Sequence, residues 1–404
     1  MHNNLLTHQM IAREAAAILT EEAPFIANIN RGRQEEFGEA VNGYKKGDTV
    51  KIQIPPTGVV HDGAKFGGVS GTADAVEEQY VNLTVDTQKH IALQFGAKEK
   101  VMDLTDFKER ILRPQMQTLS SVVEANLLQR AYAGVPNLVG TAGAVPTTMK
   151  VYAQARAKLQ NFLTPPGNRS VVFSSDANTE LVDSSRQLFH AAKEIERGFL
   201  RGRIGEAQGA TFFEHQSCPV HTNGSKVAGV TVSGAGQSGN TLAIGGLTAA
   251  DTITKGSIFT IAGVYAVHPQ TGLAYAQLQQ FVVTEDFTAA GTTGSISIYP
   301  AIKATAPNKT VSAAPANSAA LTFVGAVSTA YRQDMMFHRD AFTTAFVPLP
   351  VLASCEGYTA RLPNGVSVRV MTFGDGNEDF ERTRIDVLFG FAVVRGIHAA
   401  RITE

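Results

Sequence analysis

Apolar and polar residues alternate with a period of two near the beginning of the chain, which is the pattern of half-buried β-strands. The alternation occupies residues 50–54 and recurs over 80–85 and 90–95. Residues 58–75, between these runs, are rich in glycine and poor in large side chains. Because a long loop in a compact domain is usually functional or mobile, the pattern predicts an extended hairpin with this loop at its tip.

Other stretches follow the helical period instead. The apolar residues from Leu112 to Leu127 are spaced to form one continuous helix face. A main helix is expected to begin at Pro114, because proline is tolerated in a first turn, and to end near Gly134. At 1.5 Å per residue, such a helix would be about 30 Å long. Further helices are predicted over 148–163, 176–189 and 190–200, with a strand over 169–174.

Residues 5–22 also predict an amphipathic helix, with apolar pairs seven residues apart. Two interpretations stay open at this point. The segment is either an ordinary first helix of its own domain or an arm that docks on another subunit. The sequence alone favours the first interpretation.

Residues 226–325 differ from the rest of the chain because charged residues are sparse and alanine, glycine, serine, threonine and valine dominate. Short strand-like runs separated by turn residues are typical of a small antiparallel barrel or sandwich. Later, Asn364-Gly365 between two alternating runs predicts a hairpin, and 384–394 predicts another strand. The fold class is therefore α+β, with an inserted all-β module. The six runs of the module are 228–232, 240–246, 257–267, 278–286, 294–302 and 319–327.

Charge and composition narrow the function. The 404 residues contain 35 Lys and Arg against 36 Asp and Glu, which argues against a protein whose main task is gripping nucleic acid. Cys218 and Cys355 are too few for a disulfide framework. We see no signal peptide and no apolar run of about 20 residues, so we expect no membrane association and synthesis in a reducing cytoplasm.

Two motifs invite a chemical reading. Gly234, Gly236 and Gly239 match the spacing of a dinucleotide-binding loop, but the residues that follow are poor helix formers. Such a loop needs a helix N-terminus for the pyrophosphate, so a turn between strands is predicted instead. His215, Cys218 and His221 are zinc-capable, but Pro219 opposes a common helix face and no second ligand cluster accompanies them. We therefore predict no enzyme and no catalytic, cofactor-binding or metal-binding residues.

The module and the residues after it resemble the P22-like family of tailed-phage major capsid (coat) proteins. The resemblance is carried by 254–272, 278–286 and 294–302, by "DMMFHRDAFTTAFVPLP" at 334–350, and by "RTRIDVLFGFAVVRGIHAARI" at 382–402. It is specific from 228 to 350 and rests mainly on architecture before that.

The resemblance implies an HK97-like capsid fold with an N-arm, an extended E-loop hairpin, a peripheral domain with a long spine helix, an axial domain and an inserted antiparallel β-barrel. The implied divisions are the arm 1–45, the E-loop hairpin 46–96, the peripheral domain with the spine helix 97–134, the first axial and peripheral part of the host 135–225, the inserted barrel 226–328, and the return of the host with the C-terminal strands 329–404.

The implied function is a major capsid protein of a tailed dsDNA phage, located in the virion and made in the bacterial cytoplasm. The implied partners are other copies of the chain, as pentamers and hexamers in an icosahedral shell, with a scaffolding protein and a portal, around DNA that is not bound sequence-specifically. The type member carries a long loop at the position of 235–240, so we expect contacts between capsomers to come from elsewhere. The candidate subunit-interface residues are Met10, Ile11, Ile18, Arg31, Arg33, His61, Lys65 and Phe66.

Two other functions remain as alternatives. A β-rich tail or surface-adhesion protein would also use a module rich in serine, threonine and glycine, but it explains the long spine helix poorly. A dinucleotide-binding enzyme is the weaker alternative, because the glycine motif lacks its helix.

Overall fold

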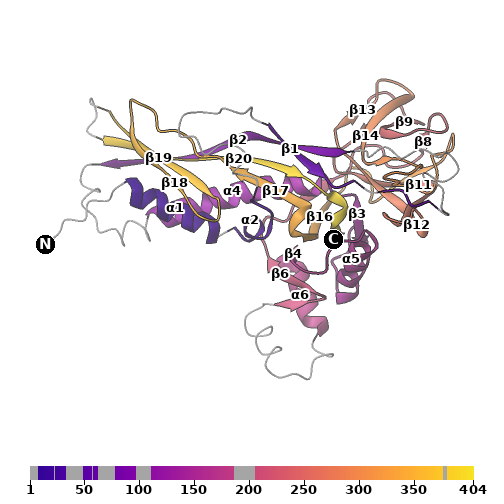
Figure 1. Cartoon of the computed structure of the whole chain (residues 1–404), viewed down its shortest axis with the longest axis horizontal. Helices are drawn as coiled ribbons and strands as arrows, with labels where there is room; N and C mark the ends of the chain where they lie inside the picture. The colour runs from indigo at the N-terminus through magenta and orange to yellow at the C-terminus, as the bar shows by residue number, and fades with distance from the viewer. Residues whose placement is uncertain are drawn as a thin grey trace. The chain divides into compact units, whose positions relative to one another are not determined.

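The computed structural model describes residues 8–21, 23–32, 49–56, 58–61, 78–96, 111–185, 205–375 and 380–404 (Figure 1). The fold is α+β and rich in strands. The chain divides into two compact units, each with its own sheet. Unit 1 consists of Met1–Ile52, Val81–Leu128 and Phe342–Val394, and unit 2 of Gln53–Tyr80, Gln129–Ala341 and Arg395–Glu404.

A six-stranded sheet forms the centre of unit 1. Its order is β1-β2-β20-β19-β18, and β17 also pairs with β20. The alternating runs predicted over 80–85 and 90–95 prove to be parts of one 18-residue strand, β2. A register shift between Val85 and Thr87 lets the polar residues between the runs continue the ladder with β20. The strands are β1 (Thr49–Ile54), β2 (Gln79–Gly96), β17 (Phe342–Phe346), β18 (Glu356–Arg361), β19 (Ser367–Asp375) and β20 (Phe380–Val393).

Close backbone approach and turn chemistry explain two glycines of this sheet. Gly390 of β20 lies against β2, where a Cβ atom would stand 2.3 Å from the carbonyl oxygen of Thr84. The predicted hairpin at Asn364-Gly365 is confirmed, because it joins the antiparallel strands β18 and β19. Gly365 has a φ of +93°, a conformation that residues with a Cβ atom rarely adopt.

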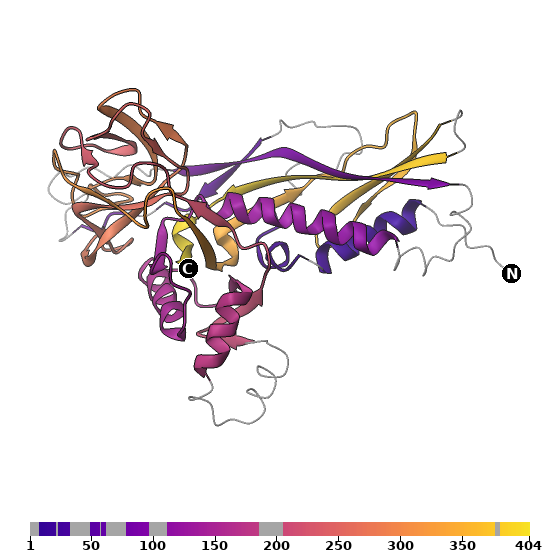
Figure 2. The same cartoon turned by 180° about the vertical axis from the view of Figure 1, so that it is seen from behind.

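Helices α1 (His8–Glu21), α2 (Pro24–Asn28) and α4 (Arg113–Tyr132) belong to one side of this sheet (Figures 1 and 2). The Ser120 hydroxyl on α4 donates to the carbonyl oxygen of Leu19 on α1 at 3.4 Å. The long helix predicted from Pro114 is confirmed: α4 begins one residue before Pro114. Its predicted apolar face is buried, including Met116, Leu119, Val123 and Leu127.

The main sheet of unit 2 has seven strands, in the order β3-β21-β16-β4-β6-β5, and β7 also pairs with β16. The predicted strand at 169–174 and helix at 148–163 are confirmed as β4 and α5. Helix α6 confirms the described part of the prediction over 176–189, and 190–200 lies outside the described residues. The elements are β3 (Asn137–Gly140), α5 (Met149–Asn161), β4 (Arg169–Phe173), α6 (Ser175–Ser185), β5 (Glu206–Ala207), β6 (Ala210–Glu214), β7 (Val220–Thr222), β16 (Ala330–His338) and β21 (Ala399–Thr403).

A second sheet in unit 2 contains one strand from each of the six predicted runs, in the order β15-β11-β12-β14-β9-β8. Its two outer strands are joined as well: Val232 N–H donates to the carbonyl oxygen of Ala319 at 2.9 Å, and Leu321 N–H to that of Val230 at 2.9 Å. We call residues 230–323 the closed sheet. Its strands are β8 (Thr231–Val232), β9 (Gly239–Gly245), β11 (Ile258–Val267), β12 (Ala274–Val283), β14 (Thr293–Ile302) and β15 (Leu321–Phe323), with the short pair β10 (Thr252–Ile253) and β13 (Phe287–Thr288) beside them.

The interior of the closed sheet is apolar, as the alternation predicted. Phe259 lies at its centre, with ring centroids 5.6 Å from Phe281 and 5.2 Å from Phe323. Residues of all six strands contribute to this core. The closed sheet therefore has a hydrophobic core of its own.

Candidate functional site

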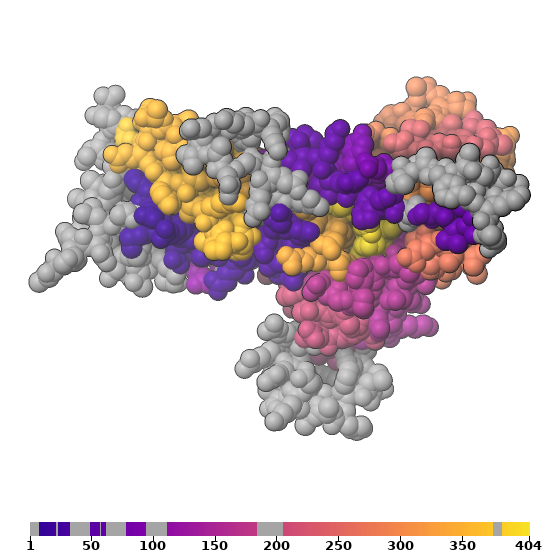
Figure 3. All heavy atoms as spheres, viewed as in Figure 1, coloured from indigo at the N-terminus to yellow at the C-terminus, as the bar shows by residue number. Residues whose placement is uncertain are grey.

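The predicted interface residues on α1 differ in exposure. Met10 and Ile11 are half-buried, whereas Ile18 is 2% exposed. Helix α1 packs on β18 and β19 of its own chain (Figure 3), and Asn364 Nδ2 donates to Thr20 Oγ1 at 3.1 Å. For residues 8–21 the structure thus favours the interpretation as a helix of its own domain, and it assigns Ile18 to that domain's core.

The other predicted interface residues lie outside α1 in the sequence. Arg31 is half-buried, and its Nη2 donates to the carbonyl oxygen of Ala27 at 3.5 Å. His61 is exposed. Arg33, Lys65 and Phe66 lie outside the described residues. The interface role of Met10, Ile11, Arg31 and His61 stays a prediction.

The glycine motif is a turn between β8 and β9, as the poor helix propensity predicted. Gly234, Gly236 and Gly239 all have positive φ angles. The side chain of Gln237 holds the turn together: its Nε2 donates to the carbonyl oxygen of Ser233 at 2.9 Å, and its Oε1 accepts from Ala243 N–H at 2.6 Å. Strand β9 begins at Gly239, so a strand follows the motif where a dinucleotide site would need a helix.

His215 and Cys218 lie on the connector between β6 and β7, and His221 lies in β7 itself. The ring Nδ1 of His215 accepts from Ser217 N–H at 3.0 Å, and Cys218 Sγ donates to the carbonyl oxygen of His215 at 3.4 Å. Within the described part of the chain, no three His, Cys, Asp or Glu side chains are grouped as metal ligands. Burial raises the pKa of the Cys218 thiol, which makes it a poor nucleophile.

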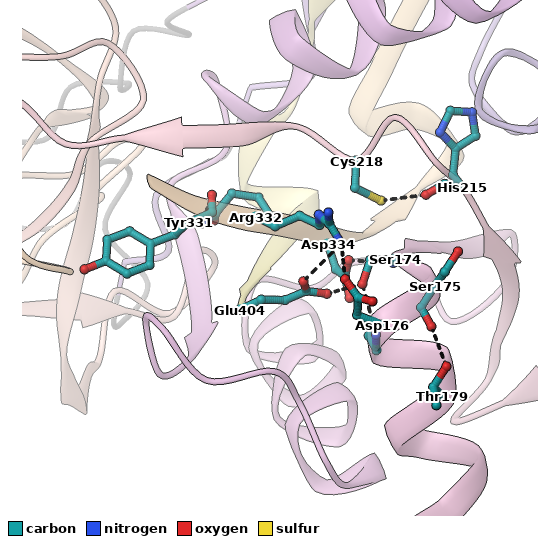
Figure 4. A network of polar contacts seen from close by, with 12 residues as sticks. Ser174, Ser175, Asp176, Thr179, His215, Cys218, Tyr331, Arg332, Asp334 and Glu404 are labelled. Carbon is teal, nitrogen blue, oxygen red and sulfur yellow. Dashed lines mark hydrogen bonds and ion pairs between the residues drawn. The ribbon is translucent and has the colours of Figure 1, made fainter. Parts of the chain in front are cut away.

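A buried polar network at the N-terminus of α6 is the main cluster that sequence reasoning missed (Figure 4). Asp334 of β16 is fully buried, and its carboxyl oxygens accept from Ser174 N–H at 2.9 Å and from the Tyr152 hydroxyl at 2.9 Å. The Ser174 hydroxyl donates to Glu404 Oε1 and accepts from Ala177 N–H at 3.0 Å, which caps α6.

Arg332 brings a positive charge to this network. Arg332 Nη1 lies 2.6 Å from Asp176 Oδ2 and 3.9 Å from Glu404 Oε2. Burial, and next the negative charge of Glu404, raise the pKa of Asp334 well above its usual range. Both effects favour the protonated, uncharged form of Asp334. Such a group holds strands and a helix together, and its burial leaves it no access to a substrate.

A second set of polar contacts joins the closed sheet to β3 and α5. The Gln280 carboxamide of β12 pairs with both backbone groups of Leu138: Oε1 accepts from its N–H at 2.9 Å, and Nε2 donates to its carbonyl oxygen at 3.1 Å. Lys158 Nζ donates to the same carbonyl oxygen at 2.7 Å and to Gln280 Oε1. We call Leu138, Lys158 and Gln280 the seam contact.

A buried arginine of unit 2 is also held by neutral groups. Arg401 of β21 donates from Nη2 to the carbonyl oxygen of Gly256 at 2.8 Å, and its guanidinium lies 5.4 Å from the centre of the Tyr132 ring. Burial lowers the pKa of His221, which lies near Arg401, to about 4, so His221 is neutral at pH 7. These contacts fix strands and connectors rather than a reacting group.

Comparison with known proteins identifies the family to which the chain belongs. A family model described as "P22 coat protein - gene protein 5" matches residues 39–399, which covers most of both units. The chain therefore belongs to the P22 coat protein family. It is a phage major capsid protein, and as such a component of the virion.

No curated protein matches the chain in sequence. Among solved structures, it is similar to one titled "Mycobacterium phage Che8" (16% identity, TM-score 0.45, covering 93% of this chain and 90% of that one). It is also similar to "Capsid of Ralstonia phage GP4" (8% identity, TM-score 0.44, covering 94% and 87%). At these values the likenesses carry no argument, and the assignment rests on the family model. None of the described helices is long and apolar enough to cross a membrane.

Proposed function

We propose that this coat protein is the shell-forming subunit of a tailed dsDNA phage, with an HK97-like fold, assembling as pentamers and hexamers into an icosahedral shell. The observation that carries the proposal is the match of the coat-protein family model across 39–399. The long helix α4 beside a sheet that contains the long strand β2 supports the assignment of a spine helix and an E-loop hairpin.

We also propose that the closed sheet is the inserted β-barrel domain of this fold. The chain leaves unit 2's main sheet after β7 and returns at β16, and these two strands are paired, with Thr222 opposite Ala330. At the same neck, Asn223 N–H donates to the carbonyl oxygen of Thr329 at 3.2 Å. Entry and exit points this close together are what an inserted domain requires.

The proposed partners are other copies of the chain, a scaffolding protein and a portal, and the subunit is made in the bacterial cytoplasm. The near balance of 35 basic against 36 acidic residues suits a container that encloses DNA without adhering to it. Catalysis has no place in this function. The accessible predicted interface residues, Met10, Ile11, Arg31 and His61, belong to the proposed contacts between subunits.

Expression of the chain with and without a scaffolding protein, followed by negative-stain electron microscopy and sedimentation, tests the proposal. Closed particles in the megadalton range are expected. Tubes or trimeric fibres would instead support the tail or adhesion alternative. Small discrete oligomers under every condition would exclude shell assembly.

A variant in which a short Gly/Ser linker joins Asn223 directly to Thr329 tests the domain assignment. It is expected to impair subunit folding or change particle size while leaving the family's shell-forming elements in place. Particles identical to those of the full chain, formed in equal yield, would show that the closed sheet has no part in assembly.

A further inference from the structure

The seam contact combines a complete hydrogen-bonded pair with an additional charge. Gln280 alone satisfies both the N–H and the carbonyl oxygen of Leu138, much as a neighbouring strand would. Lys158 Nζ then adds a second donor to two acceptors that already have partners. Leu138 is otherwise packed in a small apolar cluster with Ile258 and Val282. The docking of the closed sheet therefore does not require Lys158.

Among the described residues, those that line the space beside Lys158 supply no countercharge. A cavity of about 20 Å³ lies beside it, between α5 and β12, and is lined among others by Asn137, Asn161, Tyr275 and Gln279. None of its lining residues is acidic, and Tyr275 is the other titratable one. Burial of a cation against neutral acceptors alone is unfavourable, because the lost hydration is only partly replaced.

The cavity beside Lys158 has room for a solvent molecule. A cavity of this volume is large enough for one water molecule. A water there can accept from Lys158, whose ammonium carries three protons.

We propose that the closed sheet is docked on β3 and α5 through a releasable latch: the Gln280 carboxamide holds the sheet, and the Lys158 ammonium, with a water in the adjoining cavity, weakens that hold. A carboxylate at position 280 would neutralise the lysine and lock the seam, and the chain has a neutral amide there instead. The inference concerns contacts inside unit 2 and does not depend on shell assembly.

The Leu138 amide is a direct reporter, because its N–H donates to Gln280 Oε1. Hydrogen exchange at this amide, measured on the unassembled full chain by mass spectrometry with residue-level fragmentation, follows opening of the latch. The amide of Val171, in the core of the main sheet, reports global unfolding. A change at Leu138 without a change at Val171 assigns the effect to the seam.

Three substitutions test separately whether Gln280 holds the seam contact and whether Lys158 weakens it. Gln280→Leu should speed Leu138 exchange about tenfold or more, because the N–H loses its acceptor. Lys158→Met should leave exchange unchanged or slow it, and Gln280→Glu should slow it about tenfold by pairing the lysine with a carboxylate. Lys150→Met, an exposed position on the same helix, is the matched control.

The double variant Lys158→Met/Gln280→Glu should exchange faster than wild type, because it buries a carboxylate without its cation. Acceleration by Lys158→Met equal to that of Gln280→Leu would overturn the proposal and make Lys158 an ordinary stabilising contact. Faster exchange in Gln280→Glu would overturn it as well.

The pH dependence gives a second test. Burial lowers the pKa of Lys158 from 10.5 to about 8, so the docked state binds fewer protons than the open state. Docking should therefore tighten as pH rises from about 8 to about 10.5. The tightening should appear as greater protection of the Leu138 amide, once its exchange rate is corrected for the intrinsic pH dependence of amide exchange. Lys158→Met should abolish this dependence, and its persistence in that variant would contradict the proposal.

Discussion

The two units bury an aspartate on a central strand in different ways. In unit 1, the side chain of Asp386 on β20 lies 2.9 Å from Arg369 Nη2 and 2.8 Å from Arg384 Nε. In unit 2, Asp334 on β16 is equally buried, but its neighbours include a backbone N–H, a tyrosine hydroxyl and a second carboxyl group. One carboxylate is compensated by cations, whereas the surroundings of the other favour its protonated form.

The difference shows that burial alone does not determine what an aspartate does. A carboxylate removed from water must gain a countercharge or lose its charge. The ladder of unit 1 places Arg369 directly opposite Asp386, so the countercharge comes from the neighbouring strand. The ladder of unit 2 places Ile402 opposite Asp334, and the nearest charged neighbour, Glu404, carries the same sign. Asn substitution at each aspartate, which keeps its shape, tests this comparison.

The largest effect is expected from Asp386→Asn. It leaves two arginines without their carboxylate, one of them nearly buried, so the free energy of unfolding should fall by about 3 kcal/mol. Urea denaturation, with hydrogen exchange at amides of β19 and β20, measures it. Asp86→Asn, on the exposed side of β2, is the control and should change stability by less than about 0.5 kcal/mol.

A smaller effect is expected from Ser174→Ala. The substitution removes the hydroxyl that caps α6 and donates to Glu404, so unit 2 should lose about 1–2 kcal/mol. Ser174→Thr keeps the hydroxyl, and Ser175→Ala changes an exposed neighbour. If thermal denaturation shows that Ser175→Ala lowers stability as much as Ser174→Ala does, the hydroxyl of Ser174 has no special part in the network.

The smallest effect at neutral pH is expected from Asp334→Asn, because the surroundings of Asp334 already favour an uncharged side chain. Its effect should appear in the pH profile instead. Because the pKa of Asp334 is raised in the folded protein, the wild type loses stability as pH rises above about 4, the value in the unfolded chain. The loss can reach about 1.4 kcal/mol per pH unit from this group.

Urea midpoints of wild type and Asp334→Asn between pH 4 and pH 7 measure this difference. The variant should show a flatter curve and equal or greater stability at pH 7. A loss at Asp334→Asn as large as that at Asp386→Asn would break the comparison, because it would mean that Asp334 is ionised in the folded protein.

Much of the fold followed from local pattern. The alternation of small apolar residues between 228 and 327 predicted the six strands of the closed sheet. Asn364-Gly365 predicted the hairpin between β18 and β19 of unit 1. Pro114 indicated the start of α4 within one residue. These features depend on side-chain periodicity and turn chemistry, which neighbouring residues carry.

The polar clusters could not be found in this way. Ser174 and Asp334 are 160 positions apart, and Ser174 and Glu404 are 230 apart. The available signals were weak: an aspartate inside the apolar run "DMMF", and a serine directly after a strand. Whether such an aspartate meets an arginine or another acid depends on strand order and register, which the local pattern does not contain.

The sequence by itself determined the strands of the closed sheet, the long helix α4 and membership of the coat protein family, because period, capping and motif are properties of neighbouring residues. The tertiary structure alone decided that Ile18 belongs to its own domain's core and that Asp386 is paired with arginines while the surroundings of Asp334 favour its protonated form. It also decided that, within the described part of the chain, the acceptors of Lys158 are neutral. These outcomes depend on which residues, far apart in the sequence, are buried together away from water, because the energy of a buried charge depends on the groups around it.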